Sequence, residues 1–174
     1  MGFEKVENSE YCFKEISSVN IELIEDFSCG SIELDKKLLQ MKKHNEGITI
    51  VLIDTINNCI IGYCTYTTSG LKIGDRNYNI TYPASEIKFF AIDEKYQHKE
   101  YDEYFKISDL MLCEIIKRLF EISEDIIYFE YVLLYSVPNA VSFYERNGFR
   151  KFSEYMVSDS YMYIDGCIPM FLTL

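Results

Sequence analysis

A strand, a helix and a second strand in the middle of the chain constrain the fold more than any other part of the sequence. The segment 86–93 (EIKFFAID) carries the apolar run of a buried strand, and the segment 126–135 is strongly strand-like as well. Between them, Ser108 is a good helix N-cap. An apolar stripe with helical spacing follows it at Leu112, Ile115, Ile116 and Leu119. A connection of this length predicts two parallel strands joined by a right-handed crossover.

The remaining segments add antiparallel strands and further helices. In chain order, the patterns predict a strand near 3–14, helices over 16–27 and 34–44, a hairpin of 48–55 with 59–69, a short helix over 140–147, and strands near 150–156 and 169–174. No repeat, low-complexity tract or linker interrupts them, which favours a single domain over residues 1–174. The predicted fold class is α/β (α+β), with a mixed sheet and helices on both of its faces. A ligand of such a sheet binds at the carboxyl ends of the parallel strands, which places the site among residues 90–93, 94–107 and 136–144.

The segment 139–149, NAVSFYERNGF, lies at that end of the sheet and ends in a helix stop. Gly148 occupies the position where a helix C-cap needs a positive φ. In that termination motif the next residue packs back on the last turn, so Phe149 is expected to contact Tyr144. Capping explains neither the hydroxyl of Tyr144 nor the choice of Asn139.

Composition excludes several classes of function. The net charge of −11 makes nucleic acid an unlikely partner unless one face is locally basic. The six cysteines show no CxxC spacing and there are two histidines, so we expect no metal site and reduced thiols in a cytoplasmic protein. No run approaches the 18 or so apolar residues of a transmembrane helix, so no membrane association is expected.

The order of elements, ending in SVPNAVSFYERNGF, resembles the GNAT superfamily of acyl-CoA-dependent N-acyltransferases over nearly the whole chain. The segment EIKFFAID is similar to the family strand that holds the pantetheine arm, which implies that Phe90, Ala91 and Ile92 bind the cofactor. The resemblance implies a GNAT-like, mostly antiparallel twisted sheet with one splayed parallel strand pair. It also implies acetyl-CoA as cosubstrate, attacked directly by a primary amine in a ternary complex.

The resemblance also assigns roles to single residues. By motif position Tyr144 is the general acid that protonates the leaving thiolate, and it also lines the cofactor site; the alternative is a core tyrosine. Asn139 corresponds to a residue that hydrogen-bonds the cofactor arm, and the alternative is a helix N-cap. Glu86 matches the offset of a catalytic base in some members, and the alternative is an ordinary solvent-facing strand residue. Covalent catalysis is disfavoured because no cysteine has a histidine nearby in sequence.

One segment departs from the family pattern. The glycine-rich pyrophosphate loop is replaced by Gln97-His98-Lys99-Glu100-Tyr101-Asp102, in which acidic residues stand for both glycines. We expect a loop over 97–107 ordered by Tyr and Phe packing, with Gln97, Lys99 and the helix start at Ser108 holding the phosphates.

Three functions follow in order of preference. The first is an N-acetyltransferase for a small-molecule or protein amine, compatible with a homodimer. The second is a catalytically silent binding or regulatory module of the same fold, with weakened or lost CoA binding. The third, less favoured, is a toxin-type acetyltransferase of aminoacyl-tRNA. It rests on FSCGSIELD (27–35), which resembles the acceptor-side helices of a toxin-like branch.

Overall fold

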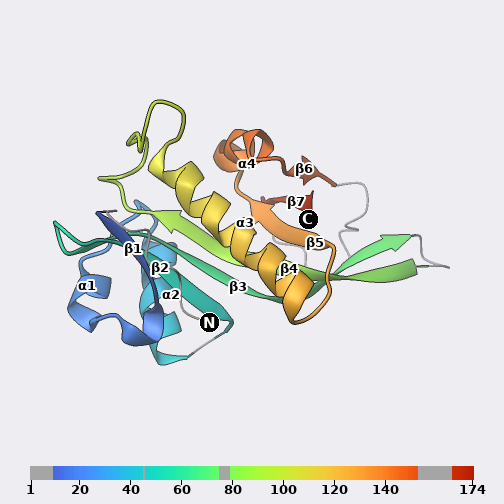
Figure 1. Cartoon of the computed structure of the whole chain (residues 1–174), viewed down its shortest axis with the longest axis horizontal. Helices are drawn as coiled ribbons and strands as arrows, with labels where there is room; N and C mark the ends of the chain where they lie inside the picture. The colour runs from blue at the N-terminus through green and yellow to red at the C-terminus, as the bar shows by residue number, and fades with distance from the viewer. Residues whose placement is uncertain (1–9, 45, 75–78, 153–165) are drawn as a thin grey trace. The chain divides into compact units, whose positions relative to one another are not determined.

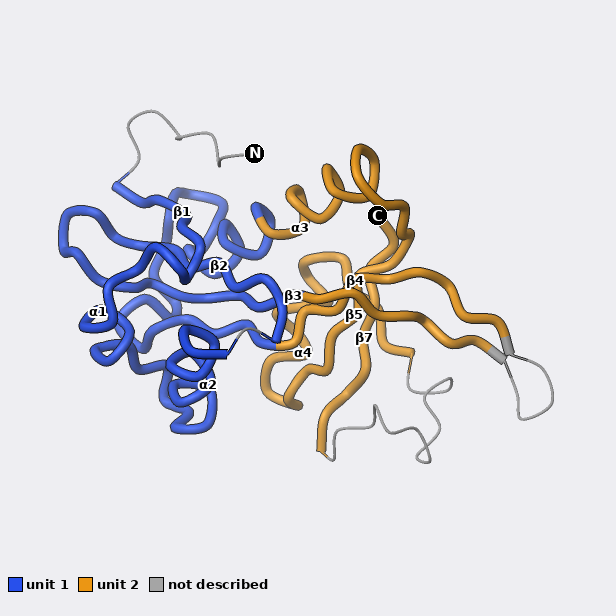
Figure 2. The backbone as a smooth tube through the Cα atoms, turned by 90° about the horizontal axis from the view of Figure 1, so that it is seen from below, with its two compact units in different colours: residues 1–66, 89–114 blue, residues 67–88, 115–174 orange. Residues whose placement is uncertain are grey.

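The computed structural model describes residues 10–44, 46–74, 79–152 and 166–174. They form two compact units, one made of residues 1–66 and 89–114 and the other of residues 67–88 and 115–174 (Figure 2). The strand order of the sheet is β1-β2-β3-β4-β5-β7-β6 (Figure 1). That the chain forms one domain over 1–174 stays a prediction.

The first unit is built on an antiparallel meander. Strands β1 (Tyr11–Glu15) and β2 (Ile48–Asp54) pair antiparallel, and β2 pairs with the first part of β3 (Cys59–Gly74). The carboxylate of Asp54 closes the β2–β3 turn by accepting hydrogen bonds from the amides of Ile56 and Asn57 at 2.9 and 2.8 Å. The predicted hairpin is confirmed. The predicted first strand lies partly outside the described residues, which begin at Glu10.

The predicted helix over 16–27 is wrong, because the chain breaks at Val19 and Asn20. A 3-10 turn, η1 (Ile16–Ser18), is followed by the short helix α1 (Ile21–Glu25). The ammonium group of Lys42, on helix α2 (Ile32–Lys43), accounts for the break. It donates hydrogen bonds of 2.8–2.9 Å to the carbonyl oxygens of Ile16, Ser17 and Val19. A distant side chain therefore takes the carbonyl groups that a continuous helix would use.

One hydrophobic cluster holds the first unit together. It joins the helices to the strands through Ile24, Leu38, Met41, Val51, Ile53 and Tyr63. Gly62 lets the end of strand β4 (Asn79–Ile92) approach closely, since a Cβ there would lie 2.6 Å from the carbonyl oxygen of Ala91. Helix α3 (Ile107–Asp125) begins in this unit, and Met111 packs against the same glycine.

The second unit contains the parallel pair. Residues Ala84–Ile87 of β4 pair in parallel with Tyr131–Leu134 of β5 (Tyr131–Ser136). Strand β7 (Ile168–Thr173) then pairs antiparallel with β5 on one side and with β6 (Arg150–Lys151) on the other. The mixed, mostly antiparallel sheet with one parallel pair confirms the predicted fold class.

The parallel strand β5 begins later than predicted. Residues 126–130 lie outside it, and the amides of Ile126 and Ile127 both donate to the carbonyl oxygen of Ile122 at 3.0 Å. Residues 126 and 127 of the predicted strand therefore hydrogen-bond to the last turn of α3, and the strand starts only at Tyr131. Residues 153–156 of the predicted strand near 150–156 lie outside the described part of the chain.

Candidate functional site

The helix stop after α4 (Val141–Arg146) has the expected geometry. Gly148 has a φ of +89°, and its amide donates to the carbonyl oxygen of Glu145 at 3.1 Å. The amide of Phe149 donates to the carbonyl oxygen of Tyr144 at 3.0 Å. These two bonds are the Schellman pair, and they satisfy carbonyl groups that the helix leaves open. The Phe149 contact predicted from sequence is confirmed.

Tyr144 is buried between two aromatic rings. Its ring centroid lies 4.9 Å from that of Phe143 and 5.7 Å from that of Phe149, and both pairs are edge-to-face. Packing of this kind would be satisfied by phenylalanine. The ring packing alone therefore does not explain the choice of tyrosine, and its role as a general acid stays a prediction.

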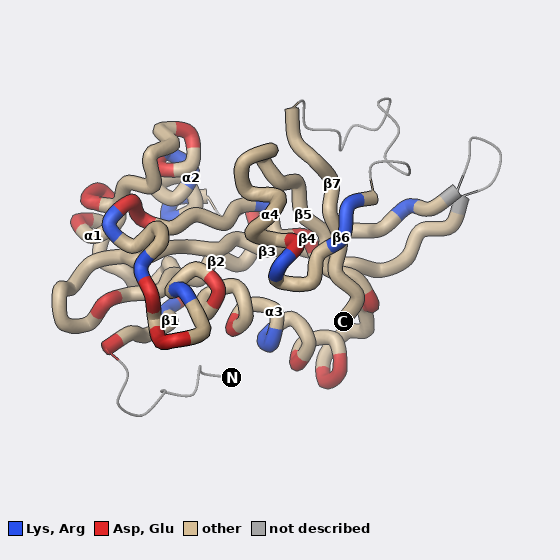
Figure 3. The backbone as a smooth tube through the Cα atoms, turned by 90° about the horizontal axis from the view of Figure 1, so that it is seen from above, with Lys and Arg blue, Asp and Glu red and all other residues tan. Residues whose placement is uncertain are grey.

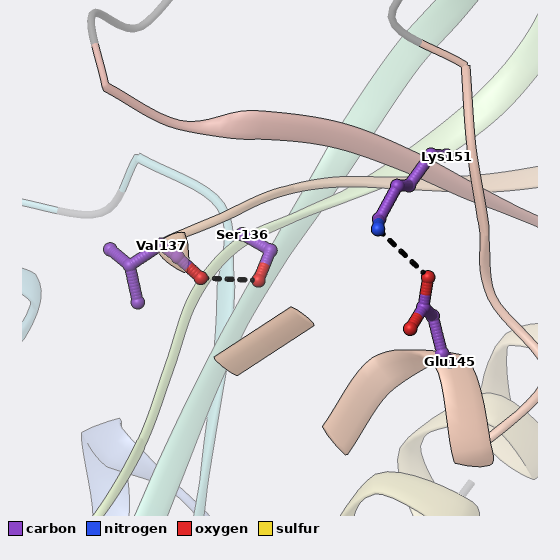
Figure 4. Close-up of polar contacts among 4 residues, drawn as sticks. All are labelled: Ser136, Val137, Glu145 and Lys151. Atoms are coloured by element: carbon purple, nitrogen blue, oxygen red, sulfur yellow. Dashed lines mark hydrogen bonds and ion pairs between the residues drawn. The ribbon is translucent and has the colours of Figure 1, made fainter. Parts of the chain in front are cut away.

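Asn139 does not cap a helix. It lies in the 3-10 turn η2 (Pro138–Ala140), and Ala140 occupies the N-cap position of α4 without a side-chain bond. Just before this turn, at the end of β5, the hydroxyl of Ser136 donates to the carbonyl oxygen of Val137 at 2.9 Å (Figure 4). Asn139 is exposed, and its side chain hydrogen-bonds to no described residue. Its amide is thus available to a ligand.

Glu86 lies in the interior of the sheet, and not at an edge. It pairs with Leu133 of β5, and β4 is flanked by β3 on the other side. Its carboxylate is half-buried and accepts a hydrogen bond of 3.0 Å from the hydroxyl of Ser69 on β3. Sequence reasoning missed Ser69, which no motif marks. A carboxylate oriented by a hydroxyl can accept a proton directly or through water.

The parallel pairing ends next to Glu86. It stops at Ile87 and Leu134, although β4 continues to Ile92 and β5 to Ser136. That the two strands splay apart beyond this point stays a prediction. Beyond it, Ala91 and Ile92 are buried and Phe90 is half-buried.

The residues after β4 form a tight turn in the first unit. The carboxylate of Asp93 accepts hydrogen bonds from the amides of Ser28 and Lys95 at 3.2 and 2.9 Å. The side-chain amide of Gln97 donates to the carbonyl oxygens of Cys29 and Ile92 at 2.8 and 3.0 Å. Both N–H groups of Gln97 therefore hold the turn, which leaves its carbonyl oxygen for other contacts.

Tyr96 anchors this turn to the β2–β3 hairpin. Its hydroxyl donates to Asp54 at 2.7 Å and lies 3.3 Å from the sulfur of Cys59. Burial, followed by the hydrogen bonds with Cys59 and Asp54, raises the pKa of Tyr96, so the phenol stays protonated. The ammonium group of Lys99 lies over the Tyr96 ring, 4.4 Å from its centroid. Lys99 itself is exposed.

Two expectations for the loop 97–107 are wrong. Helix α3 begins at Ile107, so Ser108 lies inside its first turn and is not the N-cap. The carboxylate of Asp109 instead accepts from the amide of Lys106 at 3.3 Å. The second expectation, that Tyr and Phe packing orders the loop, also fails for part of it, because Tyr104 is 84% exposed and Phe105 is 53% exposed. The order there comes from backbone hydrogen bonds and from Asp102.

Solved structures share this arrangement. The structure matches a crystal structure of a bacterial toxin with a TM-score of 0.72 and 21% identity, over 94% of this chain and 89% of that one. It matches AtaT complexed with acetyl-methionyl-tRNAfMet (TM-score 0.68, 14% identity, 94% of each chain). It also matches the KacTA–DNA complex (TM-score 0.67, 16% identity, 94% of this chain and 92% of that one). Other AtaT structures among the matches contain acetyl-CoA or the C-terminus of the antitoxin AtaR. The chain has the GNAT fold.

At these identities the likeness shows the fold alone. The sequence matches no protein-family model and no curated protein. None of the helices in the described part of the chain is long and apolar enough to span a membrane.

The expectation that nucleic acid is an unlikely partner, which was drawn from the net charge, is wrong. Among the GNAT-fold neighbours, AtaT is complexed with a charged tRNA and KacTA with DNA. Net charge averages over the surface and misses local runs of one sign. Here Arg146 at the end of α4 and Arg150 and Lys151 in β6 lie close together in the chain (Figure 3). Lys151 forms an ion pair with Glu145 at 3.1 Å (Figure 4), whereas exposed Arg150 forms none with the described residues.

The described residues contain no group of side chains that could hold a metal, and three of the cysteines have raised pKa values. No three His, Cys, Asp or Glu side chains among them come together as metal ligands. Burial, and then the hydrogen bond with Asp35, raises the pKa of Cys29 to about 11. Burial alone raises the pKa of Cys64 and Cys167. A protonated thiol is a poor nucleophile, so these cysteines are unsuited to covalent catalysis.

Proposed function

We propose that the chain is an N-acetyltransferase that moves the acetyl group of acetyl-CoA to a primary amine by direct attack in a ternary complex. The observation that carries the proposal is the buried position of Tyr144 in α4, the helix that follows the parallel strand β5 of a GNAT fold. Acetyl-CoA as the donor is supported by the AtaT neighbours that contain it.

Two proton transfers accompany the proposed reaction. The amine nitrogen attacks the thioester carbonyl carbon, and the proton it loses passes to Glu86, directly or through water. The carbon–sulfur bond breaks, and the CoA thiolate takes the proton of the Tyr144 hydroxyl. Solvent exchange then restores both groups. Ser69 orients the Glu86 carboxylate by the hydrogen bond of 3.0 Å.

Other residues would bind the donor. We assign the pantetheine arm to Phe90, Ala91 and Ile92 at the end of β4 and to the amide of Asn139. We assign the pyrophosphate to Lys99 and to the amides of the first turn of α3, which include Ser108, because a helix start attracts anions. Gln97 holds the turn by its two N–H groups, so its own contribution to the ligand is limited to its carbonyl oxygen.

The acceptor we propose is the α-amino group of an aminoacyl-tRNA. The AtaT complex with acetyl-methionyl-tRNAfMet supports it, as does the basic run that contains Arg150. Lys and Arg side chains bind the phosphates of nucleic acid even when a protein is acidic overall.

The test is transfer of radiolabelled acetyl from acetyl-CoA to a set of charged tRNAs. Uncharged tRNA and small polyamines serve as alternative acceptors, and Tyr144→Phe serves as the control enzyme. Labelled aminoacyl-tRNA formed by the wild type, and much less by the variant, supports the proposal. Labelled polyamine alone would overturn the acceptor. Acetyl-CoA binding without any transfer would favour the silent module.

A further inference from the structure

An exposed aromatic pair stands on a short turn before helix α3. Tyr104 and Phe105 are 84% and 53% exposed, although the other tyrosines of this segment are more covered. Tyr96 is buried, and Tyr101 packs on Tyr11 with ring centroids 6.1 Å apart. The fold therefore leaves Tyr104 and Phe105 without a packing role.

The turn that carries them is rigidly bonded. One carboxylate oxygen of Asp102 accepts hydrogen bonds from the amides of Tyr104 and Phe105 at 2.7 and 2.8 Å. The carbonyl oxygen of Phe105 accepts from the amides of Tyr101 and Asp102 at 2.8 and 3.2 Å. A ladder bridge between Glu100 and Lys106 closes the base. A preorganised turn loses little conformational entropy when a ligand binds to it.

Cationic side chains flank the turn on both sides. Lys106 directly follows Phe105, and Lys99 precedes the bridge. The carbonyl oxygen of Lys99 accepts a hydrogen bond of 3.0 Å from the amide of Ile107, which fixes Lys99 at the start of α3. The charge of Asp102 is meanwhile held by two amides of its own loop. Exposed aromatic rings on a turn that is flanked by two lysines match a ligand that joins a planar base to phosphates, and they do so although exposed Glu100 and Glu103 lie on the same turn.

We propose that Tyr104, with Phe105 beside it, stacks on the adenine ring of acetyl-CoA while Lys99 and Lys106 contact its phosphates. The inference rests on acetyl-CoA being the donor, as proposed above. A loop without glycines presents few backbone amides to a pyrophosphate, and base stacking supplies the hold on the nucleotide that those amides do not. Stacking on a tyrosine face requires no hydrogen bond to the base, so exposed aromatic side chains suffice.

The test measures the dissociation constant of acetyl-CoA by titration calorimetry for the wild type, Tyr104→Ala, Tyr104→Leu and Tyr104→Phe. Loss of one stacking partner should weaken binding by about 5- to 100-fold in Tyr104→Ala. Tyr104→Leu should weaken it nearly as much, because leucine has no aromatic face. Tyr104→Phe should bind like the wild type. Tyr128→Ala, which removes a tyrosine that is 68% exposed after α3, is the matched control and should change nothing.

The outcomes separate this inference from the proposed function. If Tyr104→Ala binds acetyl-CoA as tightly as the wild type, or if Tyr128→Ala weakens binding equally, the stacking role is overturned. The enzyme proposal stays intact in both cases. Unchanged acetyl-CoA binding with weakened tRNA binding in Tyr104→Ala would assign the aromatic pair to RNA, and also overturns it. A wild type that binds no acetyl-CoA at millimolar concentration overturns the donor and this inference together. Thermal unfolding of each variant verifies that it is folded.

Discussion

The amide of Phe149 donates to the carbonyl oxygen of Tyr144 at 3.0 Å, and the two rings meet edge-to-face with centroids 5.7 Å apart. Gly148, which lies between the two residues in the chain, makes both contacts possible because it reverses the chain at a φ of +89°. Neither contact uses the Tyr144 hydroxyl. The position of the ring and the chemistry of the hydroxyl can therefore be tested separately.

Tyr144→Phe should lower the turnover number and leave the fold in place. The backbone bond and the ring packing persist in the variant, whereas the proposed general acid is gone. Loss of a general acid typically lowers the rate by about 10²- to 10⁴-fold. Steady-state kinetics, with the acetyl-CoA dissociation constant measured alongside, checks this. Full activity in the variant would remove Tyr144 from the mechanism.

Gly148→Ala should destabilise the protein by about 1–2 kcal/mol, since an L-residue is strained in the left-handed region. A Cβ at this position would also lie 3.3 Å from a terminal methyl carbon of Leu172, which can move. Gly166→Ala is the matched control, because Gly166 has a φ of +76° and no atom within 4 Å of such a Cβ. Urea unfolding of both variants separates backbone strain from crowding. Equal stability of Gly148→Ala and wild type would contradict the cap.

Glu86→Gln should lower the rate of acetyl transfer by about 10²- to 10⁴-fold if the carboxylate is the base. Glutamine keeps a side-chain oxygen that can accept the hydrogen bond from Ser69, so the strand pairing should survive. Ser69→Ala is the companion variant. It removes only the orienting hydroxyl, and we expect a smaller loss. A Ser69→Ala rate below that of Glu86→Gln would show that the hydroxyl, and not the carboxylate, matters.

Asp54→Asn should destabilise the protein at neutral pH but much less in acid. Burial by itself would raise the pKa of Asp54, but hydrogen bonds from Asn57, Tyr96 and Ile56 outweigh it and hold the pKa below the ordinary value of 3.8. The unfolded chain binds a proton more readily. The charged carboxylate therefore contributes stability above about pH 4, and this contribution is lost as the pH falls through the lower pKa of the folded state.

Urea unfolding of wild type and Asp54→Asn at about pH 7 and about pH 3 measures this difference. Tyr96→Phe is the control, since it removes one of the hydrogen bonds and keeps the charge. A stability difference that does not shrink in acid would mean that the charge of Asp54 contributes nothing.

Arg150→Ala should weaken tRNA binding without changing acetyl-CoA binding. Removal of one cation that binds a phosphate should reduce the slope of log K against log salt by about 1. Lys117→Ala, which removes an exposed cation from α3, is the matched control. Filter binding of charged tRNA over a series of salt concentrations checks it. An equal effect of both variants would indicate a nonspecific contribution of charge.

The helix stop could be predicted from the sequence because its causes are local. Gly148 and Phe149 adjoin the helix that they end, and the backbone bonds span only a few residues. The same holds for the β2–β3 hairpin around Asn57 and Asn58. The crossover was predictable from the length of the connection, since a strand, a long helix and a strand can return to one sheet in few ways.

The break at Val19, the hydrogen bonds of the Gln97 side chain and the orientation of the Glu86 carboxylate were decided by tertiary structure. Each depends on partners that are distant in the chain: Lys42 binds the Val19 carbonyl 23 residues away, Gln97 binds that of Cys29 68 residues away, and Ser69 meets Glu86 across 17. Periodicity shows which residues tend to be covered, and it carries no information on which distant polar group takes a given carbonyl. The local pattern of this sequence therefore determined where α4 stops and which fold the chain adopts. Only the tertiary structure decided which polar side chains hydrogen-bond to the loops and which remain available to a ligand.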